Sequence, residues 1–261
     1  MIGIFDSGLG GLSVLAAIAR SLPRANLTYL ADTAHVPYGN KPDAFIRGRV
    51  AAIGEHLVAQ GCSMLVVACN TATAAAVGVL REKFPQLPIV GVEPGVKPAA
   101  QASRSRRIAV LATESTAKSE RLARLIADHA QGVAVDVEPC PGWATRVENL
   151  HLDGPDFAAE VAARVEPLLA AGADRIVLGC THYSFLTPLL TPLVAGRAEL
   201  VDVAEAIARQ CLRLAGSAGE GHGELHLIAT AQPERLHAAL PALGLGWLGS
   251  RASEPARLAR I

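Results

Sequence analysis

Short apolar runs alternate along this chain with longer segments that have the residue spacing of helices. The first four runs cover residues 2–5, 27–30, 64–68 and 89–92, and Ala/Leu-rich stretches such as 43–60 lie between them. The runs are apolar at successive positions, which is typical of strands covered by helices on both faces. The pattern therefore predicts an α/β fold in which mostly parallel sheets are flanked by helices.

The strand pattern begins again after residue 107. The second series covers residues 108–112, 133–137, 176–179 and 200–203. Each of its members lies roughly 105 to 111 positions after a member of the first series, and an offset this constant is the signature of an internal repeat. We therefore expect two pseudo-symmetric α/β domains.

A glycine-rich connection at residues 215–224 leads to one more expected strand at 225–231 and a helix at 233–244. Proline at the start of that helix suits its first turn. We expect this tail to pack back on the first domain, which makes that domain discontinuous. The predicted first domain is 1–95 plus 206–261, and the predicted second domain is 96–205.

Composition excludes several classes of protein. The 261 residues are 51% apolar and 18% charged, with a formal net charge of zero, so nothing in the charge balance favours nucleic acid. The beginning of the chain does not resemble a secretory signal, and no apolar run approaches the roughly 18 residues that span a bilayer. The five cysteines include no C-x-x-C pair. We therefore expect a cytoplasmic protein with reduced thiols, without a metal and without membrane or direct nucleic-acid binding.

Two cysteines stand at the same point of the two series. Cys69 follows the third run of the first series and Cys180 the third run of the second. Ligands of open α/β sheets bind beyond the carboxyl ends of the strands, where a helix N-terminus also favours a thiolate. The strand ends also carry polar residues that can bind or exchange protons with a small ligand: Asp6, Ser7, Asn70, Thr71, Thr181 and His182.

Other readings of these motifs are weaker. The turn after the first run, "DSGLGG", imitates a dinucleotide-binding loop, but it lacks the third glycine at the required spacing. Pyridoxal chemistry would need a Schiff-base lysine. None of the chain's lysines lies in a recognisable setting for that cofactor, so we expect no cofactor: Lys41, Lys83, Lys97 and Lys118.

A matched pair of thiols suits the inversion of a stereocentre. One group removes a proton from one face of the carbon, and the other delivers a proton to the opposite face. Because enantiomers have equal free energy in water, traffic in both directions calls for two nearly equivalent bases. A duplicated fold with one thiol in each half meets that demand.

Several stretches resemble the motifs of the glutamate racemase family over nearly the whole chain. They are "FDSGLGGLSV", "YLADTAHVPYG", "VVACNTATA", "GVEPGVKPA", "VLATESTAKS", "CPGWATRVE" and "VLGCTHYSFL". The resemblance implies a cofactor-independent enzyme with its active site in the cleft between two domains, and it implies D-glutamate supply for peptidoglycan. It also implies a homodimer. Some members of the family restrain DNA gyrase, so a binding or regulatory role stays open as an alternative.

The resemblance also assigns roles to residues. Cys69 matches the thiol that acts on D-glutamate and Cys180 the thiol that acts on L-glutamate, with Asp6 and His182 as their assistants. Asp32 and Glu148 match supporting positions. The expected substrate contacts are Asp6, Ser7, Tyr38, Gly39, Asn70, Thr71, Thr181 and His182. Asp6 could relay a proton, orient the substrate ammonium or act when protonated, and the sequence leaves these three roles open.

The chain departs from the family pattern at four places that flank the matched residues. They are Ser115, Trp143, Ser184 and Val203. These positions bear on the shape of the site more than on the reaction type. An enzyme of the same superfamily acting on another small dicarboxylate, whether racemase, isomerase or decarboxylase, is the main alternative.

Overall fold

The computed structural model describes residues 1–252 and 254–261, and the chain forms two compact units. Unit 1 comprises residues 1–92 and 204–261, and unit 2 comprises residues 93–203. The boundaries expected from the sequence lie two or three residues further along the chain. Residues 93–95 therefore belong to unit 2 instead of unit 1, and residues 204–205 belong to unit 1 instead of unit 2.

The sheet of unit 1 has six strands in the order β10-β9-β2-β1-β3-β4, and all of its pairings are parallel. Every residue of β1, β2 and β3 is buried, which explains why their sequences are apolar apart from Thr28 and Asp6. The strands are β1 (Ile2–Asp6), β2 (Leu27–Ala31), β3 (Met64–Val67), β4 (Ile89–Gly91), β9 (Leu225–Ala229) and β10 (Arg257–Leu258).

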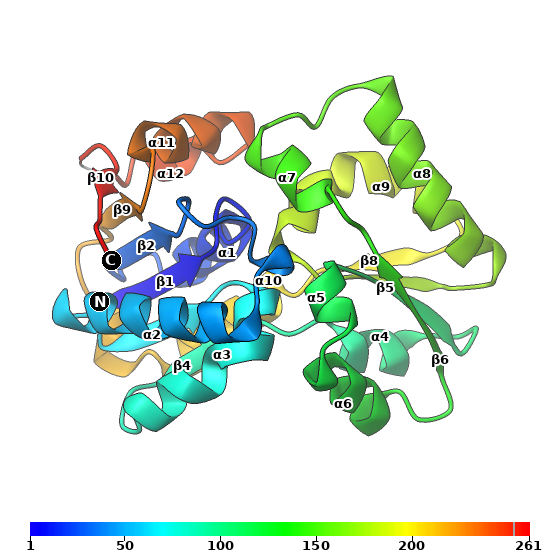
Figure 1. Cartoon of the computed structure of the whole chain (residues 1–261), viewed down its shortest axis with the longest axis horizontal. Helices are drawn as coiled ribbons and strands as arrows, with labels where there is room; N and C mark the ends of the chain where they lie inside the picture. Colours follow the sequence, from blue (N-terminus) through cyan, green and yellow to red (C-terminus); the bar gives the residue numbers. More distant parts are fainter. Residues whose placement is uncertain (253) are drawn as a thin grey trace. The chain divides into compact units, whose positions relative to one another are not determined.

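Helices cover both faces of this sheet. Strand β2 lies on one side of β1, and β3 and β4 lie on the other side. The chain therefore crosses the sheet in one direction from β1 to β2, and in the other direction from β2 to β3 and from β3 to β4. Because such crossovers are right-handed, α1 lies on one face and α2 and α3 pack together on the other (Figure 1). The helices of unit 1 are α1 (Leu12–Ser21), α2 (Asp43–Ala59), α3 (Asn70–Lys83), α10 (Ala204–Leu214), α11 (Pro233–Ala242) and α12 (Gly246–Gly249), with 3₁₀ turns η1 (Tyr38–Asn40) and η3 (Gly216–Gly219).

Unit 2 has a four-stranded parallel sheet in the order β6-β5-β7-β8. The strands are β5 (Arg107–Ala112), β6 (Ala134–Pro139), β7 (Arg175–Leu178) and β8 (Glu199–Val201). Its helices are α4 (Val96–Ala102), α5 (Glu114–Ala117), α6 (Glu120–His129), α7 (Trp143–Glu148), α8 (Pro155–Ala170) and α9 (Thr187–Val194), with the 3₁₀ turn η2 (Thr181–Leu186). Ser119 caps α6, because its hydroxyl accepts a hydrogen bond from the Leu122 amide at 3.2 Å.

The two sheets share one topology. The order β2-β1-β3-β4 in unit 1 corresponds to β6-β5-β7-β8 in unit 2. The registers agree as well: Leu65 pairs with Ile89 in unit 1, and Ile176 pairs with Leu200 in unit 2. The prediction of two pseudo-symmetric α/β units with parallel sheets is confirmed.

Unit 1 extends this common sheet at one edge. Strand β9 from the C-terminal part of the chain pairs in parallel with β2, and β10 then pairs with β9. In unit 2 the corresponding strand β6 is an edge strand, and its residues are exposed or half-buried. The tail that follows the glycine-rich connection therefore adds to the sheet of unit 1.

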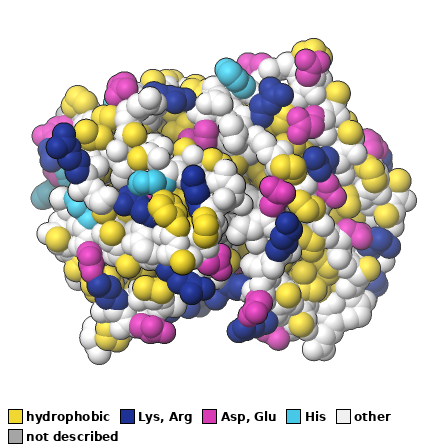
Figure 2. All heavy atoms as spheres, viewed as in Figure 1, with side chains coloured by type: hydrophobic (Ala, Val, Ile, Leu, Met, Phe, Trp, Pro, Cys, Tyr) yellow, Lys and Arg dark blue, Asp and Glu magenta, His cyan; other side chains and the backbone are white. Residues whose placement is uncertain are grey.

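Charged side chains of both signs are interspersed on the molecular face drawn in Figure 2, which shows no extended basic surface. This agrees with the formal net charge of zero. Among the described helices, none combines the length and the hydropathy that crossing a membrane requires.

Candidate functional site

The turn after β1 is organised by Asp6. The Asp6 carboxylate is fully buried, and its Oδ2 accepts hydrogen bonds from the amides of Gly8 at 3.1 Å and Gly11 at 3.0 Å. A Cβ on Gly11 would lie 2.6 Å from the Asp6 Cβ, so this close approach requires glycine. Asp6 thereby shapes the turn that carries Ser7, in addition to any of the three roles considered from the sequence.

Cys69 is the N-cap residue of α3, with φ −138° and ψ 118°. Its Sγ accepts a hydrogen bond from the Ala72 amide at 3.4 Å and lies 3.9 Å from Ser7 Oγ. A sulfur at this position receives the positive end of the helix dipole, which stabilises negative charge on it. Cys69 is 6% exposed, so water reaches it only slightly.

Asn70 and Thr71 begin α3 directly after Cys69, and both are buried. Neither Oδ1 nor Nδ2 of Asn70 has a hydrogen-bond partner among the described residues. Buried amide groups are nearly always bonded, so an Asn side chain in this state is suited to a polar ligand. Thr73 anchors the same end of the helix, because its hydroxyl donates to the Val67 carbonyl and accepts from the Val92 amide.

A buried polar network lies behind Tyr38. The Tyr38 hydroxyl donates a 2.5 Å hydrogen bond to Asp32 Oδ2, and both side chains are almost completely buried. Burial alone would raise the pKa of Asp32, but its hydrogen bonds, above all those from Arg49, lower it. Burial and the nearby negative charges of Asp32 and Cys69 raise the pKa of Tyr38, which therefore stays protonated and donates.

Arg49 on α2 is the main partner of Asp32. Its Nη2 donates to Asp32 Oδ1 at 2.8 Å and its Nε donates to Asp32 Oδ2 at 3.0 Å, which is the two-pronged geometry that guanidinium favours. Arg49 Nη1 also donates to the Ile261 carbonyl oxygen at 2.6 Å. His35 and Thr230 supply further hydrogen bonds to Asp32 Oδ1, at 3.0 and 2.8 Å. Both oxygens of Asp32 are thus engaged in holding its neighbours.

In unit 2, Cys180 follows β7 and is the N-cap residue of η2, with φ −142° and ψ 135°. The residue before it, Gly179, has no room for a side chain, because a Cβ there would lie 2.6 Å from the Leu111 backbone oxygen. Cys180 is 6% exposed. Cys180 is therefore an N-cap residue with nearly the same backbone angles as Cys69.

The Cys180 sulfur belongs to a chain of polar groups. Cys180 Sγ lies 3.6 Å from His182 Nδ1, and His182 Nε2 lies 2.5 Å from Glu148 Oε1. Burial alone would lower the pKa of His182, but its interactions with Cys180 and Glu148 raise it well above the ordinary histidine value. A histidine held in its charged form beside a sulfur favours the thiolate and can exchange a proton with it.

Two aromatic side chains support η2 from behind. Tyr183 is fully buried, and its hydroxyl donates to the Cys140 carbonyl at 3.2 Å. Trp143 packs edge-on against Tyr183, with ring centroids 5.4 Å apart, and its indole N–H donates to Glu160. The tryptophan that departs from the family pattern therefore fills the core beneath the segment that carries Cys180. Burial raises the pKa of Cys140 to about 12, so this thiol stays protonated.

The structure brings the predicted residues together in two groups. Asp6, Ser7, Asn70 and Thr71 lie with Cys69 in unit 1, where Asp32 holds Tyr38 and the adjacent Gly39. Thr181 and His182 lie with Cys180 in unit 2, where Glu148 bonds to His182. The described residues contain no group of three or more His, Cys, Asp or Glu side chains placed to hold a metal ion.

Sequence reasoning missed Arg49, His35 and Thr230. An arginine in a helix that also contains Asp43, Arg47 and Glu55 is normally read as solvent-exposed. Thr230 directly follows β9 and lies 198 positions after Asp32, and no sequence pattern links the two residues. Only the pairing of β9 with β2 reveals this contact.

Comparisons with known proteins identify the family to which the chain belongs. The family model described as Asp/Glu/Hydantoin racemase matches residues 2–211. The chain therefore belongs to this racemase family.

Its curated relatives include a glutamate racemase of Ectopseudomonas mendocina, 53% identical over 215 residues, which are 82% of each chain. A glutamate racemase of Pseudomonas aeruginosa is 46% identical over 246 residues, 93% of each chain. Among solved structures, Escherichia coli glutamate racemase in complex with L-glutamate and the activator UDP-MurNAc-ala matches with a TM-score of 0.87 and 30% identity, covering 100% of this chain and 98% of that one.

Proposed function

We propose that this protein is a glutamate racemase that interconverts L- and D-glutamate by proton transfer at the α-carbon and supplies D-glutamate for peptidoglycan. The observation that carries the proposal is the matched placement of Cys69 and Cys180. Each caps the helical segment after the third strand of its unit, with nearly the same backbone angles. The relatives named glutamate racemase support the choice of substrate.

In the proposed reaction both thiols act on one substrate. In the L-to-D direction, the thiolate of Cys180 removes the α-proton and becomes a thiol. The thiol of Cys69 then donates its proton to the opposite face of the carbanion and becomes a thiolate. The product leaves with inverted configuration, and the two sulfurs have exchanged protonation states. The reverse direction restores them, so the reaction needs no redox partner and no cofactor.

The surrounding groups have distinct proposed roles. His182, held charged by Glu148, stabilises the thiolate of Cys180 and exchanges its proton. The helix N-terminus and the Ala72 amide stabilise the thiolate of Cys69. Asn70, whose buried amide has no partner in the described part of the chain, binds the substrate together with Ser7, Thr71 and Thr181.

We propose that Asp32 and its hydrogen-bond partners hold Tyr38 in position and do not themselves transfer protons to or from the substrate. Both Asp32 oxygens are occupied by protein donors, which leaves the carboxylate poorly suited to moving substrate protons. By fixing Tyr38, it supports the Tyr38–Gly39 segment, which is expected to contact substrate.

The deciding experiment is racemisation by the purified protein without added cofactor, with the enantiomers separated by chiral chromatography. We expect L-glutamate and D-glutamate to interconvert, and we expect alkylation of the thiols to abolish this. A parallel panel with aspartate and other small dicarboxylates addresses the main alternative. Preference for another substrate would refute the glutamate assignment while leaving the two-thiol chemistry standing.

Three further properties are proposed from the family resemblance: a homodimeric state, a cytoplasmic location and, as an alternative role, restraint of DNA gyrase. Light scattering on the eluted protein measures the first, and fractionation of cells measures the second. Gyrase inhibition by a variant that lacks both Cys69 and Cys180 would establish a role separate from catalysis, and absence of inhibition would remove that role.

A further inference from the structure

The loop that follows β9 lies beside the loop that follows β2. The two strands pair in parallel as far as Ala31 and Ala229, and the next amide, that of Thr230, donates to the Ala31 carbonyl at 3.0 Å. The loop after β2 leads to Tyr38 and Gly39, which are expected to contact substrate. The tail that extends the sheet of unit 1 therefore adjoins the loop that carries an expected part of the substrate site.

Two threonine hydroxyls cross-link these loops. Thr33 Oγ1 donates to the Ala231 carbonyl at 2.5 Å and accepts from the Ala231 amide at 2.9 Å. In the other direction, Thr230 Oγ1 accepts from the Ala34 amide at 3.0 Å and donates to Asp32 Oδ1 at 2.8 Å. Thr33 thus bonds to backbone groups alone, whereas Thr230 also bonds to a buried carboxylate.

The direction of the Thr230 hydroxyl is fixed by its two partners. The Ala34 amide can only donate, and Asp32, whose pKa is lowered by its hydrogen bonds, is ionised and can only accept. The hydroxyl proton therefore points at Asp32. Serine can make both of these hydrogen bonds, whereas valine has the shape of threonine and can make neither. The contact depends on the oxygen atom and not on the shape of the side chain.

Asp32 connects Thr230 to Tyr38. Thr230 bonds to Asp32 Oδ1, and the Tyr38 hydroxyl bonds to Asp32 Oδ2 at 2.5 Å. Because a carboxylate is a rigid planar group, a donor that holds one of its oxygens also sets the direction of the other. Tyr38 is buried in a close-packed environment, so a shift of its hydroxyl is passed on to the backbone of Tyr38 and Gly39.

Unit 2 has neither the added strand nor the carboxylate. The Asp32 amide donates to the Asp6 carbonyl at 3.0 Å. At the equivalent point of unit 2, the Cys140 amide donates to the Ala112 carbonyl at 2.9 Å, so Cys140 occupies the position of Asp32. The strand before Cys140, β6, is an edge strand of the described sheet. The buried carboxylate and the strand whose loop contacts it thus occur together in one unit.

We propose that Thr230 is a positioning residue for substrate binding, through which the tail of unit 1 holds Tyr38 and Gly39 in place. This inference rests on the proposed racemase function, because glutamate is the molecule whose binding Thr230 affects. The segment is expected to contact substrate in both the ground state and the transition state, so its displacement raises KM and leaves kcat nearly unchanged. Both enantiomers are affected equally, in contrast to the loss of one thiol.

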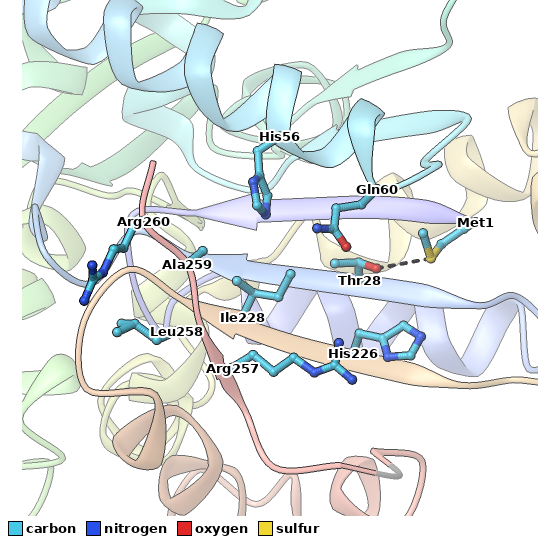
Figure 3. Close-up of a pocket in the computed structure, with 10 residues that line it drawn as sticks. All are labelled: Met1, Thr28, His56, Gln60, His226, Ile228, Arg257, Leu258, Ala259 and Arg260. Carbon is cyan, nitrogen blue, oxygen red and sulfur yellow. Dashed lines mark hydrogen bonds between the residues drawn. The ribbon is translucent and has the colours of Figure 1, made fainter.

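Steady-state kinetics test the effect on substrate. Thr230→Val should raise KM about fivefold for L-glutamate and for D-glutamate, with kcat changed less than about twofold, and Thr230→Ser should retain the KM of the unaltered protein. Thr28→Val is the matched control. Thr28 is the second residue of β2, at the far end of the strand from Asp32, and its hydroxyl donates to the Met1 sulfur at 3.3 Å (Figure 3). An unchanged KM in Thr230→Val, or an equal rise in Thr230→Ser, overturns the proposal.

A spectroscopic measurement tests the link to Tyr38 without relying on activity. The chain has three tyrosines, so protein labelled at tyrosine Cζ gives a simple NMR spectrum in which Tyr38→Phe identifies the Tyr38 resonance by its loss. Thr230→Val should shift this resonance, because the hydrogen bond to Asp32 changes, whereas Thr230→Ser and Thr28→Val should leave it in place. An unshifted resonance in Thr230→Val overturns the proposal. If the unaltered protein does not racemise glutamate, the proposed function fails, and the spectrum still decides whether Thr230 positions Tyr38.

Discussion

Cys69 and Cys180 have nearly the same backbone setting but different neighbours. The sulfur of Cys69 accepts a hydrogen bond from the Ala72 amide and lies 3.9 Å from the Ser7 hydroxyl oxygen. The sulfur of Cys180 adjoins His182, which is itself held by Glu148. The two units thus give their cysteines nearly the same backbone placement, whereas the polar groups beside the two sulfurs differ. Backbone placement and side-chain environment are separable properties of the two units.

The most severe test replaces each thiol in turn. We expect Cys69→Ser and Cys180→Ser each to reduce racemisation at least about a thousandfold, because a hydroxyl is a far poorer base than a thiolate. The two variants should fail in opposite ways when α-proton exchange with deuterated water is followed. Cys69→Ser should retain exchange from L-glutamate, and Cys180→Ser should retain exchange from D-glutamate. The same pattern in both variants would contradict the assignment of one thiol to each enantiomer.

The next test removes the group that distinguishes unit 2. We expect His182→Asn to slow proton exchange from L-glutamate by about a hundredfold, within the usual range for an acid–base group, and exchange from D-glutamate by less. His129→Asn is the control, because His129 is an exposed histidine of the same unit. Equal losses from both enantiomers would show that His182 does not serve Cys180 selectively.

The raised pKa of His182 also predicts a dependence of stability on pH. A histidine whose folded pKa is raised stabilises the native state fully below its unfolded value of about 6.5, and the stabilisation is lost as pH rises through the folded pKa. The free energy of unfolding, measured with denaturant, should therefore be lower in His182→Asn than in the unaltered protein. The difference should be largest near pH 6 and smaller in strongly alkaline buffer. A difference that grows with pH would contradict the charged state of His182.

A smaller effect on activity is expected from changing Arg49, the main hydrogen-bond partner of Asp32 in unit 1. Arg49→Lys keeps the charge but loses the two-pronged contact with Asp32, so kcat/KM should fall about tenfold, as expected for one lost charged hydrogen bond. Arg47→Lys, an exposed position of the same helix, is the control. If Arg49 acts through Tyr38, the losses in Arg49→Lys and Tyr38→Phe should not add in the double variant. Fully additive losses would show that Arg49 acts by another route.

The smallest expected effects concern the residues that precede the two cysteines. Gly179→Ala places a Cβ against the Leu111 oxygen and should lower the free energy of unfolding by about 1–3 kcal/mol. Ala68→Gly, at the matching position of unit 1, removes one buried methyl group and should lower it by about 1 kcal/mol. Thermal or denaturant unfolding measures both. An unaffected Gly179→Ala variant would show that the two backbones differ more than their angles indicate.

The strands and their repeat were predictable because both rest on local pattern. Largely apolar runs mark β1, β2, β3 and β7, and the constant offset matches Leu65 with Ile176, which occupy equivalent register positions in the two sheets. Strand ends were predicted less accurately: β8 spans Glu199–Val201 instead of 200–203, because its pairing with β7 includes Glu199 and ends at Val201. The candidate residues at strand ends followed from the general rule for parallel sheets and from family motifs.

Contacts between distant segments were not predictable. Arg49 reaches Asp32 only because α2 packs across the sheet, and Thr230 reaches it only because β9 joins β2. A single sequence carries no record of such pairings. The link between His182 and Glu148 belongs to the same class, although the family motifs had marked both residues.

The insertion of unit 2 within unit 1 has a consequence for biosynthesis. Strand β9 lies between β2 and β10, yet it is synthesised only after all of unit 2 has been synthesised. Until then β2 presents an open edge, which is a hazard for association with other nascent chains. Unit 2 is contiguous and can complete its own sheet early. The order of synthesis thus favours folding of unit 2 first. The sheet of unit 1 is completed last, when β9 becomes available to pair with β2.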